Sequence, residues 1–255
     1  MYTLSGFAVG AIVGLTGVGG GSLMTPLLVL LFGVHPATAV GTDLLYAAMT
    51  KAGGTVAHSR KGHIEWRITL RLAAGSIPAA ALTVLVLSQL PKGSTAISHI
   101  ISHGLGFALM LTAIAILFGR KLREYASQQE ESPLRQRYLG KITVLVGVIL
   151  GVLVTISSVG AGALGVAALF FLYPKLSPVK IVGSDVAHAV PLTLVAGLGH
   201  WLLGGVDWSL LGALLLGSLP GIWIGSHLSA KVPEHILRRI LASMLVLIGT
   251  KLVLA

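Results

Sequence analysis

The sequence contains no cysteine and few charged residues. Of its 255 residues only 10% are charged, with 8 acidic side chains against 18 lysines and arginines. Without cysteine, disulfide bonds, thiolate catalysis and thiolate metal ligands are excluded. Soluble domains carry about 25% charged residues, so the composition argues against a water-soluble globular protein. The chain also lacks the His-Glu-x-x-His and Gly-x-Ser-x-Gly motifs, and we therefore expect no enzymatic activity.

Apolar residues and glycine fill most of the chain. Hydrophobic residues make up 55% of the sequence, which also holds 33 glycines, and the mean hydropathy is +0.91. Several apolar runs reach about 18 to 24 residues, the length that crosses a bilayer as a helix. The sequence thus predicts an all-α, polytopic membrane bundle. The net charge of +10 lies in loops between the runs. There it indicates topology and contact with lipid headgroups, and we expect no nucleic-acid partner.

A glycine-rich stretch interrupts the first apolar run. It reads Gly14-Leu-Thr-Gly-Val-Gly-Gly-Gly-Ser22 and is followed by Thr25-Pro26. Successive glycines hold a regular helix poorly, and the apolar segment Leu23 to Val34 is too short to span about 30 Å of hydrocarbon. A second helix therefore begins deep in the membrane. Broken backbone at that depth requires a protein interior or a cavity, so we predict a broken, re-entrant helical hairpin here.

The second half of the chain repeats the first at a constant shift of 142 residues. The glycine break corresponds to Ser158-Val-Gly160-Ala-Gly162-Ala163. Other matches are Gly41-Thr42-Asp43 with Gly183-Ser184-Asp185, Pro36 with Pro178, His58 with His200, and Gly75 to Pro78 with Gly217 to Pro220. Internal repeats of this size are typical of transporters. We expect a first transmembrane repeat over residues 1–118, a basic cytoplasmic linker over 119–141 and a second repeat over 142–255.

Charge in equivalent loops indicates how the two repeats are oriented. The loop after the Asp43 segment carries Arg60, Lys61 and Arg67, whereas its equivalent, Trp201 to Trp208, carries no lysine or arginine. By the positive-inside rule the two loops lie on opposite sides of the membrane, which predicts inverted-topology repeats. Such repeats place the binding site near the membrane midplane between them. Parallel repeats remain the alternative, because the rule has exceptions.

Asp43 and Asp185 are equivalent carboxylates within predicted spans. Intramembrane carboxylates mark ion or substrate paths, although each aspartate could instead cap a broken helix or pair with a backbone N–H. His188 follows Asp185 by three residues, so a carboxylate–imidazole contact that carries a proton is geometrically available.

Lys51, His58 and His200 are three other polar residues in or at the ends of predicted spans. Lys51 either neutralises a bound anion or extends towards the headgroups. His58 and His200 stand at predicted helix ends, where solvent and the helix dipole both favour an imidazole.

These motifs together resemble one transporter family. The break Gly17 to Gly21 with Pro26, the Ala39-Val-Gly-Thr-Asp43 segment, and His58 with Gly62-His-Ile-Glu-Trp66 are similar to the TauE/SafE family of anion exporters. Their second copies, Val182 to His188 and His200 to Trp208, extend the resemblance over nearly the whole chain. The resemblance implies a multi-pass protein of the bacterial inner membrane. It also implies export of sulfite, an organosulfonate or a related small sulfur-containing or carboxylate anion.

An anion site at the two breaks fits both the residues and the resemblance. Backbone N–H groups at the starts of the half-helices hold oxyanions well, and nearby hydroxyls add donors. The predicted substrate-binding residues are Gly19, Gly20, Gly21, Ser22, Thr25, Thr42, Gly160, Gly162 and Ser184. Lys51 is a further anion contact, and Asp43, Asp185 and His188 are predicted to couple transport to protons. We expect no cofactor and no resident metal; the expected partners are the anion and membrane lipids.

Two other functions remain open at this point. A cation or metal-ion transporter would use Asp43, Asp185, His188 and His58 as ligands. A scaffold or receptor that transports nothing would need a partner surface, and the sequence offers none beyond the cytoplasmic segment. The sequence does not indicate an oligomeric state.

Overall fold

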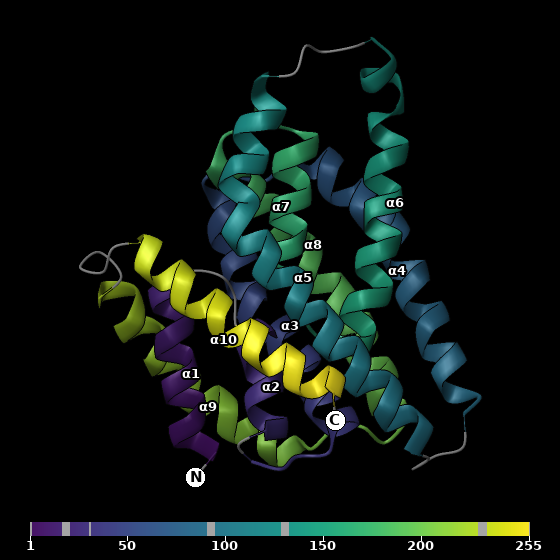
Figure 1. Ribbon diagram of the computed structural model, residues 1–255, viewed down its shortest axis with the longest axis vertical. Coiled ribbons are helices and arrows are strands. Elements are labelled where there is room, and N and C mark those ends of the chain that lie inside the picture. The colour runs from purple at the N-terminus through teal and green to yellow at the C-terminus, as the bar shows by residue number, and fades with distance from the viewer. Residues whose placement is uncertain are drawn as a thin grey trace.

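The computed structural model describes residues 2–16, 21–30, 32–90, 95–128, 133–228 and 234–254, and these residues fold into helices without any β-strand (Figure 1). The predicted all-α class is therefore confirmed. The helices are α1 (Tyr2–Thr16), α2 (Gly21–Leu30), α3 (Pro36–Arg60), α4 (Trp66–Ser88), α5 (Thr95–Gln128), α6 (Pro133–Ser157), α7 (Ala163–Leu172), α8 (Pro178–Leu202), α9 (Trp208–Leu228) and α10 (Glu234–Leu254).

Five segments of the described chain are long and apolar enough to cross a membrane. They are Trp66–Ser88, His99–Gly119, Arg137–Ser157, Pro178–Leu202 and Trp208–Gly225. The helix α7 is apolar but has only 10 residues, too few to span the bilayer. The prediction of a multi-pass membrane protein is confirmed.

Helix boundaries follow the 142-residue shift found in the sequence. The short helices α2 and α7 each have 10 residues, and α3 and α8 each have 25, with proline at the first helical position of both longer helices. Proline suits that position because its missing N–H would have no partner there. Past the end of α3 and of α8, Gly62 and Gly204 adopt positive φ angles of 67° and 79°. Equivalent residues thus start and end equivalent helices.

Two helix pairs make close glycine contacts and run parallel. A Cβ atom on Gly217, Gly221 or Gly225 of α9 would overlap the carbonyl oxygens of Thr3, Phe7 and Ala11 of α1. In the other pair, a Cβ on Gly147 or Gly151 of α6 would overlap Leu72 and Ser76 of α4. Residue numbers rise together along each pair, so the helices are parallel. Small residues allow transmembrane backbones to approach this closely.

The two long equivalent helices, α3 and α8, run antiparallel in the centre of the bundle (Figure 1). The side chain of Leu45 lies against Gly197, whereas further along α3 Gly54 meets the side chain of Val186. Residue numbers rise along one helix as they fall along the other. The equivalent helices of the two halves therefore point in opposite directions where they meet.

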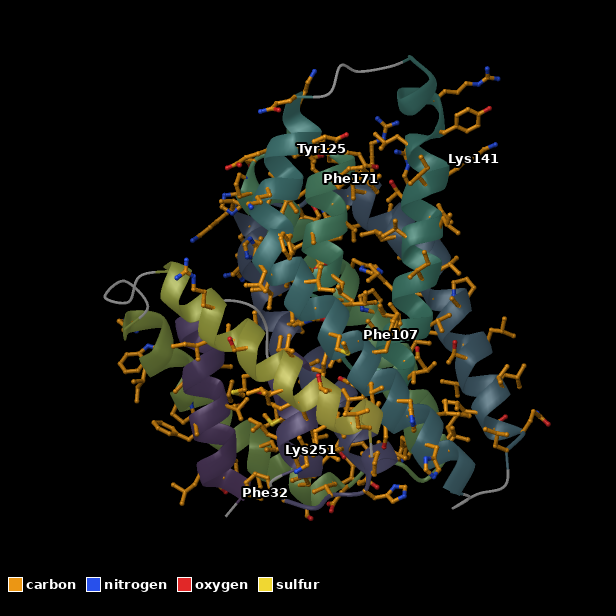
Figure 2. The ribbon with its side chains drawn as sticks, in the orientation of Figure 1. Phe32, Phe107, Tyr125, Lys141, Phe171 and Lys251 are labelled. Carbon is orange, nitrogen blue, oxygen red and sulfur yellow. The ribbon has the colours of Figure 1, made fainter. Side chains whose placement is uncertain are left out.

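The segment predicted as a basic linker is largely helical. The helix α5 continues past the predicted span end at Phe118 to Gln128, and α6 begins at Pro133. Tyr125 and Lys141 mark these extended ends in Figure 2. Arginine, lysine and glutamate favour helix, so the helices extend beyond the apolar spans. The sequence prediction located the change in polarity but not the ends of the helices.

Candidate functional site

The chain breaks between α6 and α7, where the sequence predicted its second break. Ser158, Gly160 and Gly162 have positive φ angles of 59°, 117° and 138°. Glycine adopts such conformations at little cost, whereas for serine they are uncommon. The backbone N–H of Gly165 donates to the carbonyl of Gly160 at 3.2 Å, which ties the start of α7 back to the break. The break is thus an ordered turn between two helices.

The N-terminus of α7 has no side-chain cap. Its N-cap residue is Gly162, whose missing side chain offers no acceptor to the first turn. The first backbone N–H groups of a helix have no partner within the helix and carry the positive end of its dipole. Such an end is able to bind an oxyanion. The predicted role of Gly160 and Gly162 in anion binding stays a prediction.

Lys51 connects α3 to the same break. Its Nζ atom donates a hydrogen bond to the carbonyl oxygen of Ala161, between the two positive-φ glycines. The ammonium also lies within electrostatic range of both Asp43 and Asp185. The lysine side chain therefore points to the break, where its charge adds to the positive end of α7.

Asp43 is fully buried and held by the short helix α2. Thr25 Oγ1 donates a hydrogen bond to Asp43 Oδ2 at 2.5 Å, and Ser158 of the second break also lies beside this carboxylate. The sequence predicted Thr25 as a substrate ligand, but its hydroxyl binds Asp43 in this structure. Asp43 thereby joins the first short helix to the break of the second half.

Asp185 has the equivalent position in α8 but a different environment. It is fully buried, and neither carboxylate oxygen has a hydrogen-bond partner within the described residues. The carboxylate packs against Gly165 in the first turn of α7, where a Cβ atom would overlap Oδ1. The residue equivalent to Thr25 is Ala167, which has no hydroxyl to donate. The two aspartates are therefore equivalent in sequence but not in their contacts.

The predicted contact between His188 and Asp185 is not formed. His188 Nε2 is instead 2.8 Å from Ser76 Oγ of α4, and its Nδ1 atom is buried without a partner among the described residues. In the equivalent place of the other half, Ser218 lies beside Tyr46. The serines of α4 and α9 are polar partners that our sequence analysis missed, although both lie within the repeated Gly-Ser-x-Pro motif.

Thr42 and Ser184 join the two halves rather than facing the break. Thr42 Oγ1 accepts a hydrogen bond from the backbone N–H of Asp207 at 3.1 Å, and Ser184 Oγ accepts one from the N–H of Glu65 at 2.8 Å. We call these two equivalent contacts the hydroxyl latches. Both hydroxyls thus accept a hydrogen bond from the other half, a contact that the sequence prediction of anion binding did not include.

His58 and His200 lie in the last turns of α3 and α8, as predicted, but His200 is not at the solvent. It is 2% exposed, and its Nε2 atom is 2.9 Å from the carbonyl oxygen of Thr155. The ring of His58 lies 5.7 Å from that of His63.

The predicted ligands at the first glycine break are only partly described. Gly19 and Gly20 lie outside the described residues, Gly21 begins α2, and the side chain of Ser22 is not described.

The described residues do not favour a metal site. Among them, no group of three or more His, Asp or Glu side chains could hold a metal ion. A cation transporter that binds its ion through Asp43, Asp185, His188 and His58 is therefore not favoured, because metal binding in proteins needs several converging ligands.

Comparisons with known proteins agree with the resemblance seen in the sequence. The family model described as "Sulfite exporter TauE/SafE" matches residues 2–252. The chain is 42% identical to the probable membrane transporter protein YjnA of Bacillus subtilis, over 98% of both chains. It is 30% identical to YdhB of the same organism, over 91% of both chains, and 23% identical to MJ0441 of Methanocaldococcus jannaschii, over 98% of this chain and 93% of that protein. No solved structure matches the chain. The chain thus belongs to the TauE/SafE family of membrane transporters.

Proposed function

We propose that this transporter exports a small oxyanion, such as sulfite or an organosulfonate, by alternating access between two inverted halves. The single observation that carries the proposal is the uncapped N-terminus of α7 beside the ammonium of Lys51. Backbone N–H groups and a cation together form the usual environment for an oxyanion. The family description, which names sulfite, supports the same class of substrate.

The anion in this proposal binds between the break at residues 158–162, the first turn of α7 and Lys51. Gly160 and Gly162 keep the backbone accessible because they have no side chains. Lys51 exchanges its bond with the Ala161 carbonyl for one with the anion. The equivalent first turn of α2, with Gly21 and Ser22, contributes from the other half. A pyramidal or tetrahedral anion accepts several hydrogen bonds at once, and such charge-assisted bonds are about twice as strong as neutral ones.

Inverted halves are supported by the way α3 and α8 meet. The two helices are equivalent in sequence and length, and they run antiparallel. If both cross the membrane, the repeat over 1–118 and the repeat over 142–255 have opposite orientations. The distribution of lysine and arginine in their equivalent loops agrees. Rocking one half against the other would then expose the site to each side in turn.

Proton coupling completes the proposed cycle. An ionised carboxylate beside a bound anion repels it, so a carboxylate near the site has to be protonated while the anion is bound. Asp43, Asp185 and His188 are the titratable groups of this region that the sequence singled out. Both aspartates are fully buried, where protonation removes the cost of an uncompensated charge.

Flux measurements in liposomes test the proposal. Purified protein is reconstituted, and uptake of labelled sulfite and methanesulfonate is followed under an imposed anion gradient. Gly162→Leu and Lys51→Met should each lower the flux by at least about tenfold, because each removes part of the anion site. Lys141→Met is the matched control, since Lys141 is exposed in the first half of α6 and should leave flux unchanged. Normal flux in both site variants, or flux of divalent metal ions in place of the anions, would contradict the proposal.

A further inference from the structure

The two buried aspartates differ in one respect that the repeat does not predict. Asp43 accepts a hydrogen bond from Thr25 at 2.5 Å, whereas both oxygens of Asp185 lack a partner within the described residues. The bond from Thr25 has no counterpart at Asp185, because the residue equivalent to Thr25 is Ala167. A buried carboxylate without hydrogen bonds is costly when ionised and needs a proton, a cation or a ligand.

Asp185 also lies where a bound anion would affect it most. Its carboxylate packs against Gly165 in the first turn of the uncapped helix α7. Two independent features therefore coincide at one point: an uncapped helix N-terminus and a fully buried carboxylate without a partner among the described residues. An anion at this helix end and an ionised Asp185 would compete for the same positive charge.

We propose that Asp185 takes up and releases the coupling proton, whereas Asp43 stays bound to Thr25 throughout the cycle. This inference rests on the anion transport proposed above. On the loading side a proton from water forms an O–H bond with a carboxylate oxygen of Asp185, and the anion then binds at α7. On the release side the anion leaves and the same O–H bond breaks, which returns the proton to water. Proton and anion move in the same direction.

The charge balance of the site supports this order of events. Among the described residues, the charged groups near the break are the carboxylates of Asp43 and Asp185 and the ammonium of Lys51. With both aspartates ionised, their negative charge exceeds the positive charge of the ammonium, and a bound anion would add to the excess. A proton on Asp185 offsets one charge of the anion, so the two ligands bind together more favourably than either alone.

The neighbours of Asp185 leave it free to titrate. Lys51 of α3 is the charged group that acts on it, and His188 lies one turn along its own helix but is bonded to Ser76 of α4. The helix α7 carries no titratable side chain, and α6 offers α8 the backbone carbonyl of Thr155. Among the described residues, no group of three or more His, Asp or Glu side chains could hold a metal ion, so Asp185 does not belong to a cluster of acidic ligands.

The test compares the pH dependence of flux in isosteric variants. Methanesulfonate is the probe, because it does not take up a proton in this range and any pH dependence therefore belongs to the protein. Between about pH 6 and about pH 8 on the loading side, wild-type flux should rise on acidification by up to about tenfold per pH unit, as one obligatory proton requires. Asp185→Asn should make flux independent of pH within about twofold, whereas Asp43→Asn should keep the wild-type slope.

A gain of one hydroxyl gives a second, independent test. Ala167→Thr places a donor at the position equivalent to Thr25, so Asp185 becomes hydrogen-bonded as Asp43 is and holds its proton less strongly. The pH profile of flux should then move to lower pH.

Thermal unfolding in detergent gives a further comparison of the two aspartates. Asp185→Asn should melt at or above the wild-type temperature, because an unpartnered charge is removed, and Asp43→Asn should melt below it.

The outcomes separate this inference from the proposed function. A wild-type slope in Asp185→Asn, or a flat profile in Asp43→Asn, would overturn the assignment of the proton to Asp185 while leaving anion transport intact. If Asp185→Asn fails to fold, Ala167→Thr decides: an unchanged pH profile in that variant would also overturn the assignment of the proton to Asp185. Wild-type protein that moved neither methanesulfonate nor sulfite would contradict the proposed function itself.

Discussion

Thr42 and Asp207 are joined by a hydrogen bond at 3.1 Å between the threonine hydroxyl and the aspartate backbone N–H. The equivalent pair, Ser184 and Glu65, is joined in the same way at 2.8 Å. Each half thus supplies a helix hydroxyl to a loop of the other half. Reciprocal contacts of this kind are what a two-fold relation between halves produces. The Glu65 latch has an additional ion pair with Lys180 at 2.5 Å, and the position equivalent to Lys180 is the uncharged Thr38.

Removing a latch hydroxyl should destabilise the packing of the two halves. Thr42 and Ser184 are fully buried, so Thr42→Val and Ser184→Ala each leave a backbone N–H without its acceptor. We expect a loss of about 1–3 kcal/mol in the free energy of unfolding for each. Thermal unfolding in detergent, followed by tryptophan fluorescence, measures it. Ser88→Ala is the control, because that exposed hydroxyl bonds within its own helix. Unfolding temperatures of Thr42→Val and Ser184→Ala equal to that of Ser88→Ala would contradict the expectation.

Close packing of α1 on α9 should depend on Gly217 but not on Gly212. A Cβ on Gly217 would overlap the carbonyl oxygen of Thr3, whereas a Cβ on Gly212 of the same helix meets nothing within 4 Å. Gly217→Ala should therefore destabilise by about 1–3 kcal/mol through overpacking. Gly212→Ala should be neutral or stabilising, by up to about 1 kcal/mol, because alanine favours helix. Thermal unfolding of both variants checks this, and equal melting temperatures would show that the close approach is unimportant.

Most of the fold could be predicted from the sequence, because the repeat and the apolar runs determine it. Hydropathy located the spans, and the 142-residue shift predicted equivalent helices, of which α2 with α7 and α3 with α8 begin and end at equivalent residues. Glycine marked the break before α7. The extent of α5 was not predictable from hydropathy, since a charged helix beyond the membrane resembles a loop in an apolar scan.

The side-chain contacts of the site could not be predicted in the same way. Thr25 and Asp43 come from different helices, and their hydrogen bond depends on how α2 packs against α3. Spacing along α8 suggested a pair between His188 and Asp185, but Ser76 of α4 takes the imidazole. Periodicity shows which residues share a helix face. It does not show which neighbouring helix supplies a better partner.

Asp207 should make stability depend on pH at the start of α9. Its Oδ1 atom accepts hydrogen bonds from the backbone N–H groups of Ser209 and Leu210, at 2.9 and 3.0 Å, and from the Ser209 hydroxyl at 2.7 Å. These bonds lower the pKa of the Asp207 carboxyl below its usual value, and the bonds from the Leu210 backbone N–H and the Ser209 hydroxyl have the largest effect. Because the folded-state pKa is the lower one, the stabilisation is present above the unfolded value, about 3.9, and is lost as pH falls through the folded pKa.

The measurement compares wild type with Asp207→Asn and Asp207→Ala between about pH 3 and about pH 7. Asparagine also caps helices but does not titrate, so the advantage of wild type over Asp207→Asn should shrink as pH falls below about 4. Alanine removes the cap and should cost about 0.5–2 kcal/mol near neutral pH. A constant difference between wild type and Asp207→Asn across this range would contradict a titrating cap.

The proposed inverted arrangement predicts opposite accessibility for equivalent residues. Arg60 and Leu202 are equivalent under the 142-residue shift, close the ends of α3 and α8, and are both exposed. The natural chain has no cysteine, so Arg60→Cys and Leu202→Cys each introduce a single thiol. A membrane-impermeant maleimide should label Leu202→Cys in intact cells and Arg60→Cys only in inside-out vesicles, because the positive-inside rule predicts that the basic loop at Arg60 faces the cytoplasm.

Wild type is the blank for this experiment, since it offers the reagent no thiol and any signal in it is background. Labelling in permeabilised membranes supplies the total for each variant, so a low value in intact cells reflects the side of the membrane rather than burial. Labelling of both variants from the same side would mean that equivalent helix ends face one compartment. The antiparallel contact of α3 with α8 would then have to arise without inversion of the halves, and alternating access about a shared midplane site would lose its basis.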